Sequence, residues 1–113
     1  MLLCSSCLQR SSEIPVLRAI VADFAATARR DGKMPIVLIL KDKGYDDHLF
    51  EALKPTLENA EIPYVSTHNI APATDIRNFV GDGHLVESAN NLIAEAVLEL
   101  IDEHFDRRDS LTR

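Results

Sequence analysis

The stretch Pro35-Ile36-Val37-Leu38-Ile39-Leu40 decides the fold of this chain, because it is a short, continuous run of apolar residues. Leucine and β-branched residues in such a run are typical of a strand that helices cover on both faces. The sequence therefore predicts a central strand at residues 35–40. A second, shorter strand is predicted at residues 62–66, where Pro63 stands at the entry and its missing N–H is least damaging.

Amphipathic segments flank both predicted strands. Apolar residues at helical spacing predict a helix that begins around Pro15 and ends at Arg30, and Gly32 is suited to cap its C-terminus. A second helix is predicted after Asp46, which can cap its N-terminus. Pro55 lies inside that helix and lacks the N–H that would bond four residues back. We therefore expect a kink there, or two short helices.

The clearest helical pattern comes last in the chain. Its apolar stripe consists of Ala89, Leu92, Ile93, Ala96, Val97, Leu100, Ile101 and Phe105. Acidic residues occupy the opposite side, so the stripe is expected to be buried. The order helix, strand, helix, strand, helix predicts an α/β fold in which right-handed crossovers join parallel strands and helices cover both faces of a short sheet. Residues 13–113 are expected to form one domain, preceded by an unstructured tail at residues 1–12.

Composition limits the classes of partner. The chain has 113 residues, of which 46% are hydrophobic and 27% charged, as in an ordinary soluble domain. Its net charge of -6 argues against nucleic acid or an anionic membrane as a partner, because clustered Lys and Arg hold both, and no basic patch is visible in the sequence. No segment has the length and apolar character of a signal peptide or membrane span, so the chain as written is expected to be cytoplasmic.

Potential metal ligands do not share a recognisable spacing. Cys4-x-x-Cys7 lies in the predicted tail without two further ligands nearby, and is expected to be two ordinary cysteines. Three histidines also lack ligand spacing and are expected to be solvated or to serve packing: His48, His68 and His104. Asp46-Asp47 is more typical of a helix cap than of an acid pair. We therefore expect neither a metal nor a cofactor.

The motif that carries chemistry is Gly81-Asp82-Gly83-His84, which directly precedes the last helix. An acid two residues before a histidine, in a glycine-rich loop, is typical of half of a proton relay. The nucleophile is absent from the pattern, because neither Gly-x-Ser-x-Gly nor Gly-Asp-Ser occurs in the sequence. Ser66, at a strand end, is the one serine to consider as a substitute, and it lacks the strained turn that such a residue needs.

The run from Met34 to Ile101 resembles the C-terminal part of an SGNH (GDSL-type) hydrolase, a family of α/β/α serine esterases and acyl-transferring enzymes. Two apolar strands and a helix precede Asp82-Gly83-His84, and Asn90-Asn91-Leu92-Ile93-Ala94-Glu95-Ala96 is similar to the family's sequence after its catalytic histidine. The resemblance implies a flavodoxin-like, three-layer α/β/α arrangement with a short parallel sheet, of which this chain forms one half.

The resemblance also implies roles for two residues. In that family the Asp and His complete a triad with a serine from a Gly-Asp-Ser block, and a glycine and an asparagine from middle blocks form the oxyanion hole. Asp82 and His84 match the acid and base positions, although the more common Asp-x-x-His spacing would place Gly81 at the acid position. The serine, glycine and asparagine blocks have no counterpart. The chain is therefore expected to carry the acid/base half of an ester or acyl hydrolase, and to be inactive alone.

Three interpretations follow. The chain is half of such an enzyme, through truncation, an incorrect start codon or decay, and acts on a small ester or acyl substrate once further sequence completes it. Alternatively it is a non-catalytic α/β binding or interaction module that uses the crevice at the carboxyl ends of its strands, or an open reading frame with no retained role. In the half-enzyme, the strand at residues 35–40 would keep an unpaired edge, which predicts a homodimer through that edge.

Overall fold

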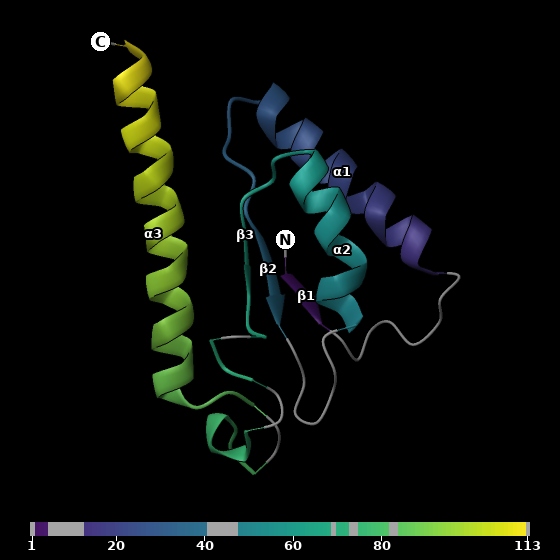
Figure 1. Cartoon of the computed structure of the whole chain (residues 1–113), viewed down its shortest axis with the longest axis vertical. Helices are drawn as coiled ribbons and strands as arrows, with labels where there is room; N and C mark the ends of the chain where they lie inside the picture. The colour runs from purple at the N-terminus through teal and green to yellow at the C-terminus, as the bar shows by residue number, and fades with distance from the viewer. Residues whose placement is uncertain are drawn as a thin grey trace.

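The structure is a computed structural model that describes residues 2–4, 13–40, 48–68, 70–72, 75–81 and 84–112. Helices and strands alternate along these ranges (Figure 1), which confirms the broad α/β class. The elements are β1 (Leu2–Cys4), α1 (Ile14–Arg30), β2 (Val37–Leu40), α2 (His48–Asn59), β3 (Tyr64–Ser66), the short 3-10 helix η3 (Ile76–Asn78) and α3 (Glu87–Thr112).

The sheet has three parallel strands in the order β1-β2-β3. Leu38 of β2 stands opposite Leu2 on one side and Val65 on the other. The predicted strand at residues 35–40 is thus confirmed as the central strand, with a parallel neighbour on each side. The second predicted strand is also confirmed, and the Val37 N–H donates to the Pro63 carbonyl at its entry.

The prediction of an unstructured tail at residues 1–12 is wrong at Leu2–Cys4, which form β1. Three apolar residues contain no periodicity of their own, and only the hydrogen bonds of the neighbouring strand β2 define them as a strand. The expected unpaired edge of residues 35–40 is wrong for the same reason, because β1 and β3 flank β2. Residues 5–12, including Cys7, and the Asp46-Asp47 pair lie outside the described residues.

Helices α1 and α2 both end in a left-handed cap. Gly32 has a φ of +73°, and the N–H groups of Gly32 and Lys33 donate to the carbonyls of Arg29 and Ala28, which confirms Gly32 as the predicted cap. In α2 the same position is taken by Glu61 with a φ of +52°. A side chain is disfavoured in this conformation, so this cap carries local strain.

Of the two alternatives predicted at Pro55, that of two short helices is wrong, because α2 is one continuous helix with Pro55 inside it. The ring of Pro55 is exposed, and the proline removes a single N–H donor, directed toward Glu51. The buried residues Leu49, Leu53 and Leu57 lie on both sides of the proline and pack in one core. This burial on one helix face outweighs the loss of one backbone hydrogen bond.

The main core lies between the α1–α2 pair and the sheet. Leu17, Val21 and Ala25 of α1 pack with the leucines of α2 and with Val37 and Ile39 of β2, which are fully buried. Helix α3 contacts β3 and runs along the side of the sheet opposite to α1 and α2 (Figure 1). The alternating burial of β2 agrees with this arrangement, since Leu38 and Leu40 are only half-buried.

The expectation that the whole apolar stripe of α3 is buried is wrong. Ala89 and Ile93 are buried, but the side chains of Leu92 and Phe105 are 49% and 55% exposed. The reason is length: the 26 residues of α3 span about 39 Å, whereas a strand of four residues spans about 13 Å. Much of α3 therefore has no strand beside it. The radius of gyration, 15.2 Å, exceeds the roughly 13 Å of a compact domain of this length.

Candidate functional site

The predicted site residues lie in the long connection between β3 and α3. Parallel strands β2 and β3 end at one edge of the sheet, and the described parts of the connection, residues 67–68, 70–72, 75–81 and 84–86, lie beyond that edge (Figure 1). These described parts contain one short 3-10 helix and one antiparallel bridge. These two features determine where His84 is held.

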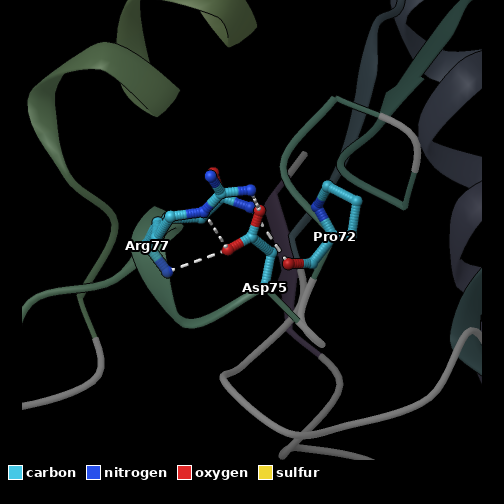
Figure 2. A network of polar contacts seen from close by, with 4 residues as sticks. Pro72, Asp75 and Arg77 are labelled. Atoms are coloured by element: carbon cyan, nitrogen blue, oxygen red, sulfur yellow. Dashed lines mark hydrogen bonds and ion pairs between the residues drawn. The ribbon is translucent and has the colours of Figure 1, made fainter.

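The first feature is a polar turn around η3. The Asp75 carboxylate accepts hydrogen bonds from the Arg77 backbone N–H at 3.0 Å and from the Arg77 guanidinium at 3.0 and 2.9 Å (Figure 2). The side-chain hydrogen bonds from Arg77 are the largest influence that lowers the pKa of Asp75 below its ordinary value. Asn78 adds a hydrogen bond from its side chain to the Pro72 carbonyl at 3.1 Å. The turn thus fixes the backbone that leads into the hairpin.

The second feature is a small hairpin that carries His84. Phe79 and Leu85 form the antiparallel bridge, and the Val80 N–H donates to the His84 carbonyl at 2.8 Å. The Phe79 side chain is buried and anchors the hairpin, with Gly81 exposed at its turn. The His84 side chain is exposed, three residues before α3 begins. Asp82, the predicted acid, lies outside the described residues.

A cluster of side chains at the end of β3 contains the substitute nucleophile considered from sequence. Ser66 is 5% exposed, and its Oγ has no hydrogen-bond partner among the described residues. The His68 ring stacks on Phe50 of α2, with ring centroids 4.0 Å apart and an angle of 17° between the planes. Ser66 lies on an extended strand and is shielded from solvent, so a substrate would reach its hydroxyl only after local opening.

The other candidates do not converge on a site. His48 is exposed at the start of α2. Across the described ranges, no group of three or more His, Cys, Asp or Glu side chains is arranged to hold a metal ion. Nor does any helix in those ranges combine the length and apolar character needed to cross a membrane.

A cavity lies at the opposite edge of the sheet, where the strands begin. It has a volume of about 880 Å³ and is bordered by the segment that enters β2 and by the last turns of α3. Four cationic side chains line it: Arg29, Lys33, Arg107 and Arg108. No basic patch is visible in the sequence, but the fold brings these four cations to one cavity. Sequence reasoning missed the patch because its members come from two segments more than 70 residues apart.

The comparisons with known proteins do not add a relative. No protein-family model, curated protein or solved structure matches the chain. The functional argument therefore rests on the residues and their arrangement.

Proposed function

We propose that this chain is the carboxyl-terminal half of an SGNH-type ester or acyl hydrolase and provides the acid/base pair of its triad. The observation that carries the proposal is the place of His84. Its exposed side chain stands on a hairpin beyond the carboxyl ends of parallel strands, directly before the last long helix. Ligand sites of open α/β sheets gather at that edge.

The order of the elements supports the same proposal. A buried strand, a helix, a second parallel strand, a histidine loop and a final helix follow one another, as in the family pattern that the sequence resembles. In the proposed parent fold, α1 and α2 form one outer layer and α3 the other, which gives a three-layer α/β/α arrangement. His84 would remove the proton of a serine, and Asp82 would orient the imidazole and stabilise its charged form.

Catalysis by this chain alone is not part of the proposal. The sequence has no Gly-Asp-Ser block, and Ser66, the substitute nucleophile considered from sequence, is buried on a strand. Without a nucleophile and an oxyanion hole a triad retains little of its rate enhancement. The substrate class, once a nucleophile is supplied, is a small ester or an acyl group.

The direct test is hydrolysis of p-nitrophenyl acetate by the purified chain. We expect turnover no faster than that of an equimolar imidazole control, and the same rate for the His84→Ala variant. Turnover above imidazole that disappears in His84→Ala would show that the chain is a complete catalyst. Turnover that disappears in Ser66→Ala would place the reaction at the end of β3 instead.

A second test concerns the DNA upstream of Met1. Translation of that DNA is expected to reveal a Gly-Asp-Ser block and, behind it, an Asn-containing block. A chain that joins this sequence to residues 1–113 should hydrolyse the ester, and His84→Ala should abolish its activity. Upstream sequence that contains neither block would contradict the half-enzyme proposal.

One observation favours a second candidate, a non-catalytic α/β binding module. The cavity of about 880 Å³ lies where the strands begin, which we call the amino edge of the sheet, and is away from the His84 hairpin. A chain whose role is binding would use that cavity and would keep its function in His84→Ala. Ligand binding in the cavity that is unchanged in His84→Ala, together with the absence of hydrolase blocks in the upstream sequence, would favour the binding module.

A further inference from the structure

The amino edge of the sheet combines a sizeable cavity with a concentration of positive charge. Four cationic side chains line this cavity, and Glu61 is the one acidic residue among its described lining residues. The chain as a whole carries a net charge of -6, so this local excess of cations opposes the general charge of the molecule. A cleft lined by one sign of charge concentrates ligands of the opposite sign.

Among the described residues, two of the four cations, Arg29 and Lys33, form no ion pair with a carboxylate. The Arg29 guanidinium donates to two backbone carbonyls, those of Ala60 at 2.8 Å and Glu61 at 2.7 Å, and these neutral groups leave its charge in place. Lys33 is exposed and its ammonium makes no hydrogen bond or ion pair within the part of the chain that the structure describes. Both side chains can therefore attract an anion without first breaking an ion pair.

Helix ends explain part of this pattern. The C-termini of α1 and α2 reach this edge, and their last carbonyls carry partial negative charge that a cation offsets. Arg29 serves this purpose for α2. Lys33, in contrast, follows the cap of α1, and its ammonium is not bonded to a helix carbonyl within the described ranges. Its charge remains available to a ligand.

Apart from Glu61 and His104, the other side chains of the described lining are apolar. Met34 and Pro35 border the cavity beside β2, and Ile101 and Phe105 border it on α3. The Phe105 side chain is 55% exposed, although it is a large aromatic group. Ligand sites typically join such apolar walls to a few charged groups that orient the ligand.

We propose that this cavity binds a small amphipathic anion, with its carboxylate or phosphate toward Lys33 and Arg29 and its apolar body against Ile101 and Phe105. The site is separate from the His84 hairpin, so the proposal does not depend on the hydrolase assignment. A carboxylate and a phosphate would both bind to the same cations, and a pair of decyl anions that differ only in the head group distinguishes the two.

The test is isothermal titration of the full chain with sodium decanoate, decyl phosphate, acetate and decyltrimethylammonium, all below micelle-forming concentrations. We expect sub-millimolar dissociation constants for at least one of the two decyl anions. Acetate should bind at least tenfold more weakly, because it lacks the apolar body. The decyl cation should not bind. The tighter of the two decyl anions identifies the preferred head group.

Charge-reversal variants locate the site. Lys33→Glu should weaken binding of the decyl anion by about fivefold or more, since it replaces an attraction by a repulsion. Arg30→Glu is the matched control: it makes the same change of charge on the last turn of α1, but Arg30 does not line the cavity. Far-UV circular dichroism of each variant establishes that the fold is retained.

Several outcomes would overturn the proposal. These are failure of both decyl anions to bind, equal binding of acetate and decanoate, and binding of the decyl cation. An Arg30→Glu variant that weakens binding as much as Lys33→Glu would also overturn it, because the effect would then reflect net charge and not this cavity. None of these results bears on esterase activity, so failure here is distinguishable from failure of the half-enzyme proposal.

Discussion

Arg29 joins the two helices that cover the main core, and its removal should be among the most damaging surface substitutions in the chain. Its guanidinium extends from the last turn of α1 to the C-terminal end of α2, where it donates to the carbonyls of Ala60 and Glu61 at 2.8 and 2.7 Å. A helix end leaves its last carbonyls without intrahelical partners. Ala60 and Glu61 form the turn that directly follows Asn59, the last residue of α2, and a cation bound to their carbonyls also interacts favourably with the helix dipole.

The magnitude follows from these contacts. A hydrogen bond to a charged group contributes about 1.5–3 kcal/mol when it is shielded from solvent. Arg29 is exposed, so water can replace it, and the two bonds together are discounted to about 1–2 kcal/mol. Arg29→Ala should lower the free energy of unfolding by that amount. Arg29→Lys should recover about half, because an ammonium retains the charge without the planar fork that reaches two oxygens.

Urea unfolding followed by far-UV circular dichroism measures this effect. With a slope of about 1.5 kcal/mol/M, the loss lowers the urea midpoint by roughly 0.7–1.3 M. Arg30→Ala is the control, because Arg30 lies one residue away and donates only to Thr27 Oγ1 of its own helix, at 3.2 Å. Its substitution should change stability by less than about 0.5 kcal/mol. Equal losses in Arg29→Ala and Arg30→Ala would refute the reasoning, as would full recovery in Arg29→Lys.

Three further predictions concern other parts of the chain. Glu61→Gly should raise the free energy of unfolding by about 0.5–1 kcal/mol, because glycine adopts a positive φ without strain. Glu58→Gly, inside α2, is the control and should lower the free energy of unfolding by about 1 kcal/mol. A loss of stability in both variants, measured by urea unfolding, would contradict this prediction. Because the pKa of Asp75 is lowered, its carboxylate stabilises the turn fully at pH values above the carboxyl's ordinary pKa, and this stabilisation is lost as the pH falls through the lowered pKa. The NMR chemical shift of the Arg77 backbone amide should therefore titrate below pH 3.8 in the wild type and should not titrate in Asp75→Asn. Exposed apolar side chains on α3, such as Leu98, lead us to expect that the chain forms a dimer or larger species at micromolar concentration. Leu98→Glu should shift this species toward the monomer. Light scattering that shows the same monomer for the wild type and for Leu98→Glu would exclude this expectation.

Local patterns in the sequence were sufficient to predict the larger elements. The apolar run at residues 35–40 and the helical spacing around it specify β2 and α1, and Gly32 has the positive φ that its position after α1 predicts. These features depend on residues that are close in sequence. The strand Leu2–Cys4 is different, because only its hydrogen bonds to a strand more than 30 residues away make it part of the sheet.

The candidate sites divide in the same way. The Asp82–His84 loop was visible because its chemistry lies in consecutive residues, and the structure places His84 on an exposed hairpin before α3. The basic cavity was not visible, because Lys33 and Arg108 come to line one cavity only when α3 runs back along the sheet past the ends of the strands. A net charge of -6 concealed it further, since an average over the chain cannot show where the cations gather.

The exposed part of α3 links these observations. A helical stripe indicates which side of a helix is apolar, but it does not indicate how long the opposing surface is. Here the strands are much shorter than α3, so Ala89 and Ile93 near its start are buried, whereas Phe105 near its end is exposed. The same mismatch leaves the last turns of α3 projecting beyond the sheet, and the gap between them and the entrance to β2 is the basic cavity. The error in predicted burial and the cavity missed from sequence therefore have one structural cause.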